Sequence, residues 1–253
     1  MKQIVLLALL IWTCSSAAAS RLQQANDAYN RELYNQALQL YLSQEKTGEV
    51  SADLYYNIGN TYYRLKDNGH AVLYYERALL LDPSNKDARF NLEYVRERAG
   101  LQIDEGNSFF SLWTEEKVSH LSSNNWATIA LVSFLLVLAA LALYIFSDST
   151  LFRKIGFFGG LLVALVCALS LVCSWHMCDK VQNRTDAIVM AEDATFSTAP
   201  RAPKDQSEVA FKLKQGIKIS VVDSVKVADK KWCQVKLADG RVAWILAGDI
   251  EII

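Results

Sequence analysis

Residues 51–85 read SADLYYNIGNTYYRLKDNGHAVLYYERALLLDPSN, and this stretch sets the fold of the N-terminal third of the chain. Apolar and aromatic residues recur at helical spacing, which predicts two helices with a turn between them. Gly59, Ala71 and Ala78 let the two helices approach closely, and the tyrosines fill the gaps that small residues leave. The stretch therefore predicts a water-soluble helical hairpin.

The same stretch resembles the tetratricopeptide repeat, a helix pair that stacks on its neighbours. The eight signature positions are occupied by Tyr55, Ile58, Gly59, Tyr62, Ala71, Tyr75, Ala78 and Pro83. One repeat length earlier, Ala25, Ala37 and Tyr41 indicate a second, degenerate repeat, and residues 86–98 resemble a capping helix. Residues 20–100 are therefore predicted to be tetratricopeptide repeats with a capping helix. Because about three repeats normally make a stable stack, we expect this array to lean on a partner or on the membrane.

The resemblance implies a peptide-binding groove, which such repeats line with the first helix of each pair. The candidate peptide-binding residues are Asn26, Tyr29, Tyr56, Asn60, Tyr63 and Arg64. Two of them, Asn26 and Asn60, share the position at which related repeats place an asparagine that bonds the peptide backbone or its terminal carboxylate. Arg64 offers a charge-assisted partner for a carboxylate. The alternative is that these are ordinary solvated residues. Because the third helix places Phe90 and Tyr94 in the groove, the match to a carboxylate clamp is partial.

Two apolar segments, residues 126–146 and 155–175, each reach the roughly 20 residues that cross a bilayer core. Neither segment has a polar face, which argues against buried helices of a soluble core. Arg153 and Lys154 in the connecting residues 147–154 favour a cytoplasmic loop, with both outer ends exported. Residues 101–125 are predicted to be a linker and an interfacial helix, with a disordered linker as the alternative.

The chain begins with MKQIVLLALLIWTCSSAAAS, which has a basic residue, an apolar run and a small-residue end. This order is typical of a secretory signal peptide, with Ala17 and Ala19 at the cleavage site. Residues 1–19 are therefore predicted to be a signal peptide. A retained anchor and lipid attachment at Cys14 stay open as alternatives.

Residues 176–185 are predicted to be a linker, and residues 186–253 alternate apolar and polar residues between turn signals such as Asp239-Gly240. The run from Phe211 to Trp244 resembles a bacterial SH3 domain, which predicts five or so short strands in a small barrel. Such domains often accompany cell-wall hydrolases and recognise peptidoglycan, so peptidoglycan binding is one expected role. Binding a protein or bracing the repeats is the other.

The sequence shows no arrangement typical of catalysis. Its three histidines, His70, His120 and His176, lie in different segments, and no Cys-His pair, paired carboxylates or Gly-rich phosphate loop is visible. We therefore predict no enzyme activity, no cofactor and no metal site. The formal net charge of −1 gives no reason to expect nucleic acid.

The order of these parts along the whole chain resembles the BatE-type proteins of the Bacteroides aerotolerance family, with residues 52–85 as the most specific motif. The implied fold class is a multidomain membrane protein with α-helical tetratricopeptide repeats, a transmembrane helical hairpin and a small all-β SH3-like barrel. The resemblance also implies the inner membrane of Bacteroidetes, with both terminal domains in the periplasm. It implies a non-catalytic scaffold or adaptor of an aerotolerance or envelope stress complex, whose partners are von Willebrand A domain membrane proteins encoded nearby.

Overall fold

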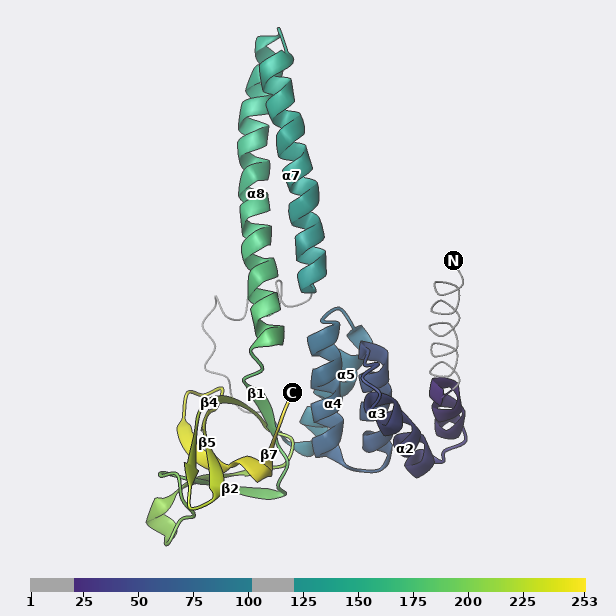
Figure 1. The fold of residues 1–253 in the computed structure, drawn as a ribbon, viewed down its shortest axis with the longest axis vertical. Coiled ribbons are helices and arrows are strands. Elements are labelled where there is room, and N and C mark those ends of the chain that lie inside the picture. The colour runs from purple at the N-terminus through teal and green to yellow at the C-terminus, as the bar shows by residue number, and fades with distance from the viewer. Residues whose placement is uncertain (1–20, 102–120) are drawn as a thin grey trace, which may run out of the picture. The chain divides into compact units, whose positions relative to one another are not determined.

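The structure is a computed structural model that describes residues 21–101 and 121–253. The described chain forms two compact units (Figure 1). One unit combines the helical repeats with the C-terminal all-β domain, and the other holds two long apolar helices. This arrangement confirms the predicted fold class. The predicted signal peptide, residues 1–19, and residues 102–120 of the predicted interfacial segment lie outside the described residues.

The repeat region consists of helices whose ends follow from local sequence. The helices are residues 21–30, α2 (Tyr34–Glu45), α3 (Ala52–Arg64), α4 (Asn68–Leu81) and α5 (Lys86–Ala99). Ser51 caps α3 by accepting a hydrogen bond from the backbone N–H of Leu54 at 3.1 Å. Asn85 caps α5 in the same way through Ala88 at 2.9 Å. At the end of α5, Gly100 adopts the left-handed conformation, with φ of 64°.

Small residues let the two helices of a repeat pack closely, as predicted. Ala71 and Ala78 of α4 are fully buried. A Cβ atom added to Gly59 would lie 2.8 Å from two ring atoms of Tyr75, so the ring of Tyr75 occupies the space of the missing side chain. The tyrosine and the glycine thus act together to set the distance between α3 and α4.

The C-terminal domain is a seven-stranded antiparallel sheet with strand order β3-β2-β6-β5-β4-β1-β7. The strands are β1 (Asp186–Val189), β2 (Asp193–Ser197), β3 (Val209–Lys214), β4 (Lys218–Val227), β5 (Lys230–Lys236), β6 (Val242–Leu246) and β7 (Ile250–Ile252). Its core includes Ile188, Phe196, Val235 and Ile245, each fully buried. Gly240 has φ of 87° in the turn between β5 and β6, which explains why a glycine follows Asp239.

The β domain packs against α4 within the same unit. The middle of α4 is buried all round, since all residues from 71 to 76 are buried together with Gly69 and Ala78. At the seam, a Cβ atom on Gly216 would lie 2.7 Å from Leu101 Cδ1, and Leu101 itself is 6% exposed. The short repeat array therefore packs against the β domain of its own chain.

The second unit is a pair of apolar helices, α7 (Ser123–Phe146) and α8 (Thr150–Gln182), which lie side by side in Figure 1. Windows within them have mean hydropathy of 2.8 and 2.5, so both are long and apolar enough to cross a membrane by length and composition. The helices approach closely where a Cβ atom on Gly156 would lie 2.8 Å from the carbonyl oxygen of Ala140. Residues 147–149 connect them, which places Arg153 and Lys154 in the first turn of α8.

Candidate functional site

The six candidate peptide-binding residues lie on two successive first helices of the repeats. Asn26 and Tyr29 belong to the helix at residues 21–30. The other four, Tyr56, Asn60, Tyr63 and Arg64, belong to α3. Five of the six are half-buried and Arg64 is exposed, so the face they occupy is an aromatic surface with a cation at one end.

Each asparagine accepts a hydrogen bond from a tyrosine on the second helix of its own repeat. The hydroxyl of Tyr41 donates to Asn26 Oδ1 at 2.6 Å, and that of Tyr75 donates to Asn60 Oδ1 at 2.7 Å. Both tyrosines are 1% exposed, and burial raises the pKa of Tyr41 to about 12. An asparagine at this position therefore satisfies a buried hydroxyl, which is a structural role that the sequence pattern did not reveal.

A second donor shares the oxygen of Asn60. Asn91 of α5 donates to Asn60 Oδ1 through Nδ2 at 2.9 Å. No acceptor for the Nδ2 atom of Asn60 is found among residues 21–101 and 121–253. Because an amide nitrogen only donates, Asn60 can offer an N–H group to a peptide carbonyl without losing its internal contacts.

Arg64 extends along an aromatic face at the end of α3. Its guanidinium lies 4.9 Å from the centre of the Tyr34 ring, and Tyr34 in turn contacts Tyr29 edge to face at 5.4 Å. The nearest carboxylate to Arg64 in this region is that of Glu32, at 3.8 Å, and both side chains are largely exposed. An exposed ion pair of this length contributes little stability, so the charge of Arg64 stays available to a ligand.

Sequence reasoning missed several neighbours of these residues. Tyr34 and Asn91 contact Arg64 and Asn60, yet neither occupies a groove position of the first helix in a repeat. Lys66 lies over the Tyr63 ring at 5.8 Å, from the turn between α3 and α4. A signal was present for Asn91, since it follows Asn57 by one repeat length, whereas nothing local marks Tyr34.

A buried carboxylate joins the repeats to the β domain. Glu76 of α4 accepts from Arg96 of α5 at 2.5 Å and from Lys218 of β4 at 3.0 Å. Lys218 also lies 3.2 Å from Asp186 of β1. Burial alone would raise the pKa of Glu76, but the cations Lys218 and Arg96 lower it to about 2. Glu76 is therefore charged at neutral pH, and it holds two elements that are far apart in the sequence.

A second polar contact lies near the C-terminal strand. Arg77 donates to the Glu251 carboxylate at 2.9 Å and to the carbonyl oxygen of Ile252 at 2.8 Å. The guanidinium also lies over the ring of Tyr74 at 5.1 Å, and the Tyr74 hydroxyl donates to Glu45 at 2.9 Å. Glu76 thus contacts β4, and the next residue, Arg77, contacts β7. Together these two contacts fix how α4 is aligned against the β domain.

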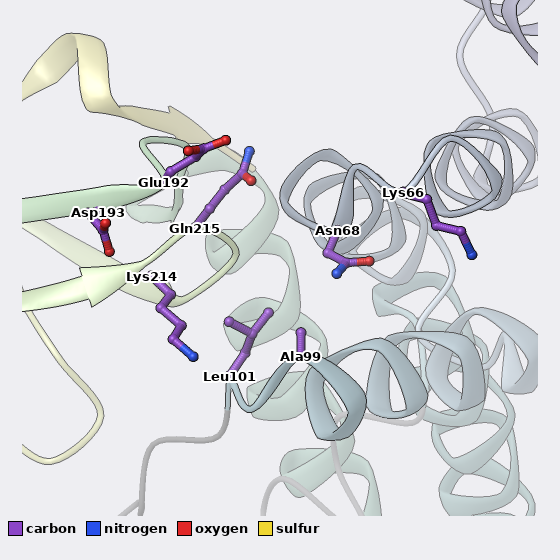
Figure 2. Close-up of a pocket in the computed structure, with 8 residues that line it drawn as sticks. All are labelled: Lys66, Asn68, Ala99, Leu101, Glu192, Asp193, Lys214 and Gln215. Carbon is purple, nitrogen blue, oxygen red and sulfur yellow. The ribbon is translucent and has the colours of Figure 1, made fainter.

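An open cleft of about 280 Å³ lies along the same seam (Figure 2). The repeats and the β domain both line it, with the residues Lys66, Asn68, Ala99, Leu101, Glu192, Asp193, Lys214 and Gln215. Two lysines and two acidic residues line it, so the cleft has no net preference for one sign of charge. Among these lining residues, only Lys66 also lies over the ring of Tyr63, one of the candidate peptide-binding residues.

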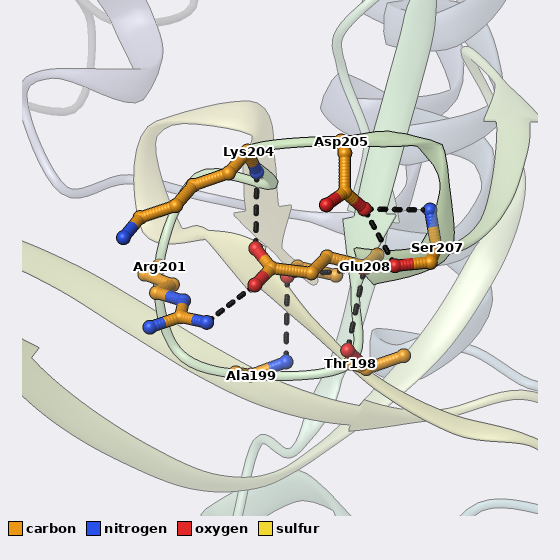
Figure 3. A network of polar contacts seen from close by, with 8 residues as sticks. Thr198, Ala199, Arg201, Lys204, Asp205, Ser207 and Glu208 are labelled. Atoms are coloured by element: carbon orange, nitrogen blue, oxygen red, sulfur yellow. Dashed lines mark hydrogen bonds and ion pairs between the residues drawn. The ribbon is translucent and has the colours of Figure 1, made fainter.

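The loop between β2 and β3 is held by its own polar network (Figure 3). The Glu208 carboxylate accepts from the Arg201 guanidinium and from the backbone N–H of Lys204 at 3.0 Å. Asp205 accepts from the backbone N–H of Ser207 at 2.9 Å. These contacts are internal to the loop, so they define its shape and indicate no ligand.

The described residues contain no group of three or more His, Cys, Asp or Glu side chains that could hold a metal ion. Cys233 is 5% exposed in the core of the β domain, and burial raises the pKa of its thiol. His70 pairs with Asp67 at 2.7 Å and stacks on Tyr62 at 4.7 Å between ring centres. Cys233 therefore packs in the core of the β domain, and His70 is held in place by Asp67 and Tyr62.

The His70–Asp67 pair makes stability depend on pH. The hydrogen bond that His70 donates to the Asp67 carboxylate raises the pKa of His70 above its usual value. Stability from protonated His70 is thus fully present below the unfolded pKa of about 6.5 and is lost as pH rises through the folded pKa. We expect the urea midpoint of the full chain to fall between about pH 6 and pH 8, and the His70→Gln variant to lack this decline. An equal decline in both proteins would contradict the assignment, and His176→Gln serves as the control.

Comparison with known proteins adds one family. The model of the tetratricopeptide repeat matches residues 52–85, which span α3 and α4. A comparison with curated proteins gives no match. The match confirms the predicted repeat, and stacked repeats of this kind present concave surfaces that bind other proteins.

Proposed function

We propose that this protein is a non-catalytic, membrane-anchored adaptor that binds an extended segment of a protein partner along the first helices of its repeats. The observation that carries the proposal is the tetratricopeptide match at residues 52–85 on a unit followed by two membrane-length apolar helices. The six candidate residues supply aromatic contacts, one amide donor on Asn60 and the exposed cation of Arg64. This combination suits a peptide backbone better than a small substrate.

The proposed location is the inner membrane, with the repeats and the β domain in the periplasm. Residues 1–19 act as a signal peptide, and the connection near Arg153 and Lys154 faces the cytoplasm. The make-up of the compact units also supports two crossings. The repeat and β unit is assembled from chain on both sides of α7 and α8. This assembly favours an even number of crossings, because two parts that pack together lie on one side of a membrane.

The resemblance to BatE-type proteins supports the identity of the partners. We propose von Willebrand A domain membrane proteins of a bacterial aerotolerance or envelope stress complex as the bound proteins. The repeats and the β domain would be tethered to the same membrane as these partners. The effective concentration of the partners near both domains is therefore high. Peptidoglycan binding by residues 186–253 is the alternative, and co-sedimentation with purified cell-wall sacculi tests it.

A donor-selective variant tests the groove. Asn60→Ala would leave the buried hydroxyl of Tyr75 without a hydrogen-bond acceptor. Asn60→Asp keeps an acceptor for this hydroxyl and removes the N–H donor of the amide. We expect Asn60→Asp with Arg64→Gln to reduce photocross-linking from position 63 to the partner in intact cells by about tenfold. Gln39→Ala with Lys46→Ala, two exposed residues outside the groove, should leave cross-linking unchanged. Equal adduct yields in all three proteins would reject the groove as the binding surface.

A further inference from the structure

One end of the repeat surface carries three cations that each lie over a tyrosine ring, and we name this group the aromatic–cation patch. It consists of Tyr34, Tyr63, Arg64, Lys66, Tyr94 and Arg98. The residues come from α2, α3, α5 and the turn after α3, so no single helix supplies the pattern. Sequence reasoning selected only Tyr63 and Arg64 as binding residues.

The patch consists of two groups of contacting residues, which meet where Tyr63 and Arg64 follow each other in α3. Lys66 lies 5.8 Å from the centre of the Tyr63 ring, and the Tyr63 ring meets that of Tyr94 edge to face at 6.0 Å. Arg98 lies 6.0 Å from the centre of the Tyr94 ring and donates to its hydroxyl at 2.9 Å. Arg64 lies 4.9 Å from the centre of the Tyr34 ring. Each cation is therefore placed by an aromatic ring.

The charges of the patch are mostly unpaired. Among the described residues, neither Lys66 nor Arg98 has a carboxylate within ion-pair distance, and Arg64 reaches only the highly exposed Glu32 at 3.8 Å. By contrast, Arg77, Arg96 and Lys218 of the same unit are each engaged by carboxylates at 3.0 Å or less. The cations of the patch thus remain able to bind an anion.

A tyrosine ring beside each cation makes that cation a better binding group for an anion. Contact with a tyrosine restricts the long side chain, so less conformational entropy is lost when a carboxylate binds. The ring face takes one side of a guanidinium and leaves its edge N–H groups for an acceptor. Tyr94 and Phe90, which are 40% and 67% exposed, offer apolar contact beside these charges.

We infer that the patch selects an acidic segment of the bound partner, with carboxylate side chains that pair with Lys66, Arg98 and Arg64. This inference rests on the proposed peptide-binding function and specifies its ligand. The Asn60 amide, further along α3, would hold the peptide backbone, while the patch would read side-chain charge. An extended acidic peptide fits this division, because it alone presents backbone carbonyls and carboxylates in series.

Charge-matched peptides provide the test with the full chain in detergent micelles. The probe is a fluorescein-labelled peptide of alternating Glu, Tyr and Ala with an amidated C-terminus, and its partner replaces each Glu by Gln. We expect the wild-type chain to bind the acidic peptide about tenfold more tightly than the neutral one. Raising the salt concentration to about 500 mM should remove most of this preference.

Two paired variants separate the patch from general charge. Lys66→Gln with Arg98→Gln should abolish the preference. Lys230→Gln with Lys231→Gln removes the same charge from the exposed start of β5 and should retain the preference. Equal binding of both peptides by the wild type, no binding of either, or an unchanged preference in the patch variant would overturn the inference. Stronger binding to anionic vesicles than to the acidic peptide would also overturn it. The groove test changes Asn60 and Arg64, whereas the patch test changes Lys66 and Arg98. Loss of cross-linking in the groove variant, with no charge preference lost in the patch variant, would therefore support the groove and overturn only the acidic ligand.

Discussion

Replacing Glu76 by Ala should lower the free energy of unfolding of the repeat and β unit by about 3 kcal/mol. The substitution leaves Lys218 and Arg96 facing each other without the carboxylate that now joins them at 3.0 and 2.5 Å. Removing one partner of a buried ion pair costs more than the pair contributes. Here Arg96 loses its carboxylate partner, and among the described residues Lys218 keeps only Asp186 at 3.2 Å. Urea unfolding of the full chain, followed by the fluorescence of Trp232 and Trp244, measures the change.

The effect should depend on pH in a defined direction. The pKa of Glu76 is lowered to about 2 in the folded chain, so its contribution is present above the unfolded value near 4.3. That contribution is lost as pH falls towards 2, and the wild type and the variant should converge there. Glu93→Ala, an exposed change on α5, should stay within about 0.5 kcal/mol of the wild type. A similarly small effect for Glu76→Ala would show that the seam does not support the fold.

The second large effect is expected for Gly216→Ala, at about 2–3 kcal/mol. Gly216 has φ of 92°, and an added Cβ atom would lie 2.7 Å from Leu101 Cδ1. Backbone strain accounts for about 1 kcal/mol, and the remainder comes from displacing the buried side chain of Leu101. Thermal unfolding of the full chain, followed by circular dichroism, measures the loss.

Gly240→Ala provides the matched comparison. Gly240 has φ of 87°, close to that of Gly216, but a Cβ atom added there would meet nothing within 4 Å. The difference between the two variants therefore isolates packing at the seam from backbone strain. Equal losses would mean that the contact with Leu101 is easily relieved.

Local sequence patterns predicted most of the fold. The small residues and tyrosines of residues 51–85 specify a helix pair. The two helices that pack together lie next to each other in the sequence, so a local pattern is enough to predict their packing. The long apolar runs of α7 and α8 predict membrane length directly. Alternation and the Asp239-Gly240 turn likewise predict a small β domain, although the number of strands is seven and not five or so.

Contacts between distant segments could not be predicted in this way. Glu76 and Lys218 are 142 residues apart, and no periodicity links them. One hint was present, since residues 71–81 of α4 are apolar on nearly every side, which indicates a helix covered all round. The candidate site shows the same limit. The repeat pattern located Asn60, but only the structure revealed that its oxygen serves Tyr75 and Asn91.

The membrane-length helices are inserted between the two parts of one compact unit, and this has a consequence for synthesis. Lys218 leaves the ribosome 142 residues after Glu76, which is roughly 7 to 28 s later at about 5–20 residues per second. During that interval the repeats exist without the domain that covers α4. The helices proposed to bind a partner emerge first, and the β domain that packs against them emerges last. Binding competence is thus expected only once translation has reached the C-terminal strands, so that prematurely terminated chains present no competing copy of the groove.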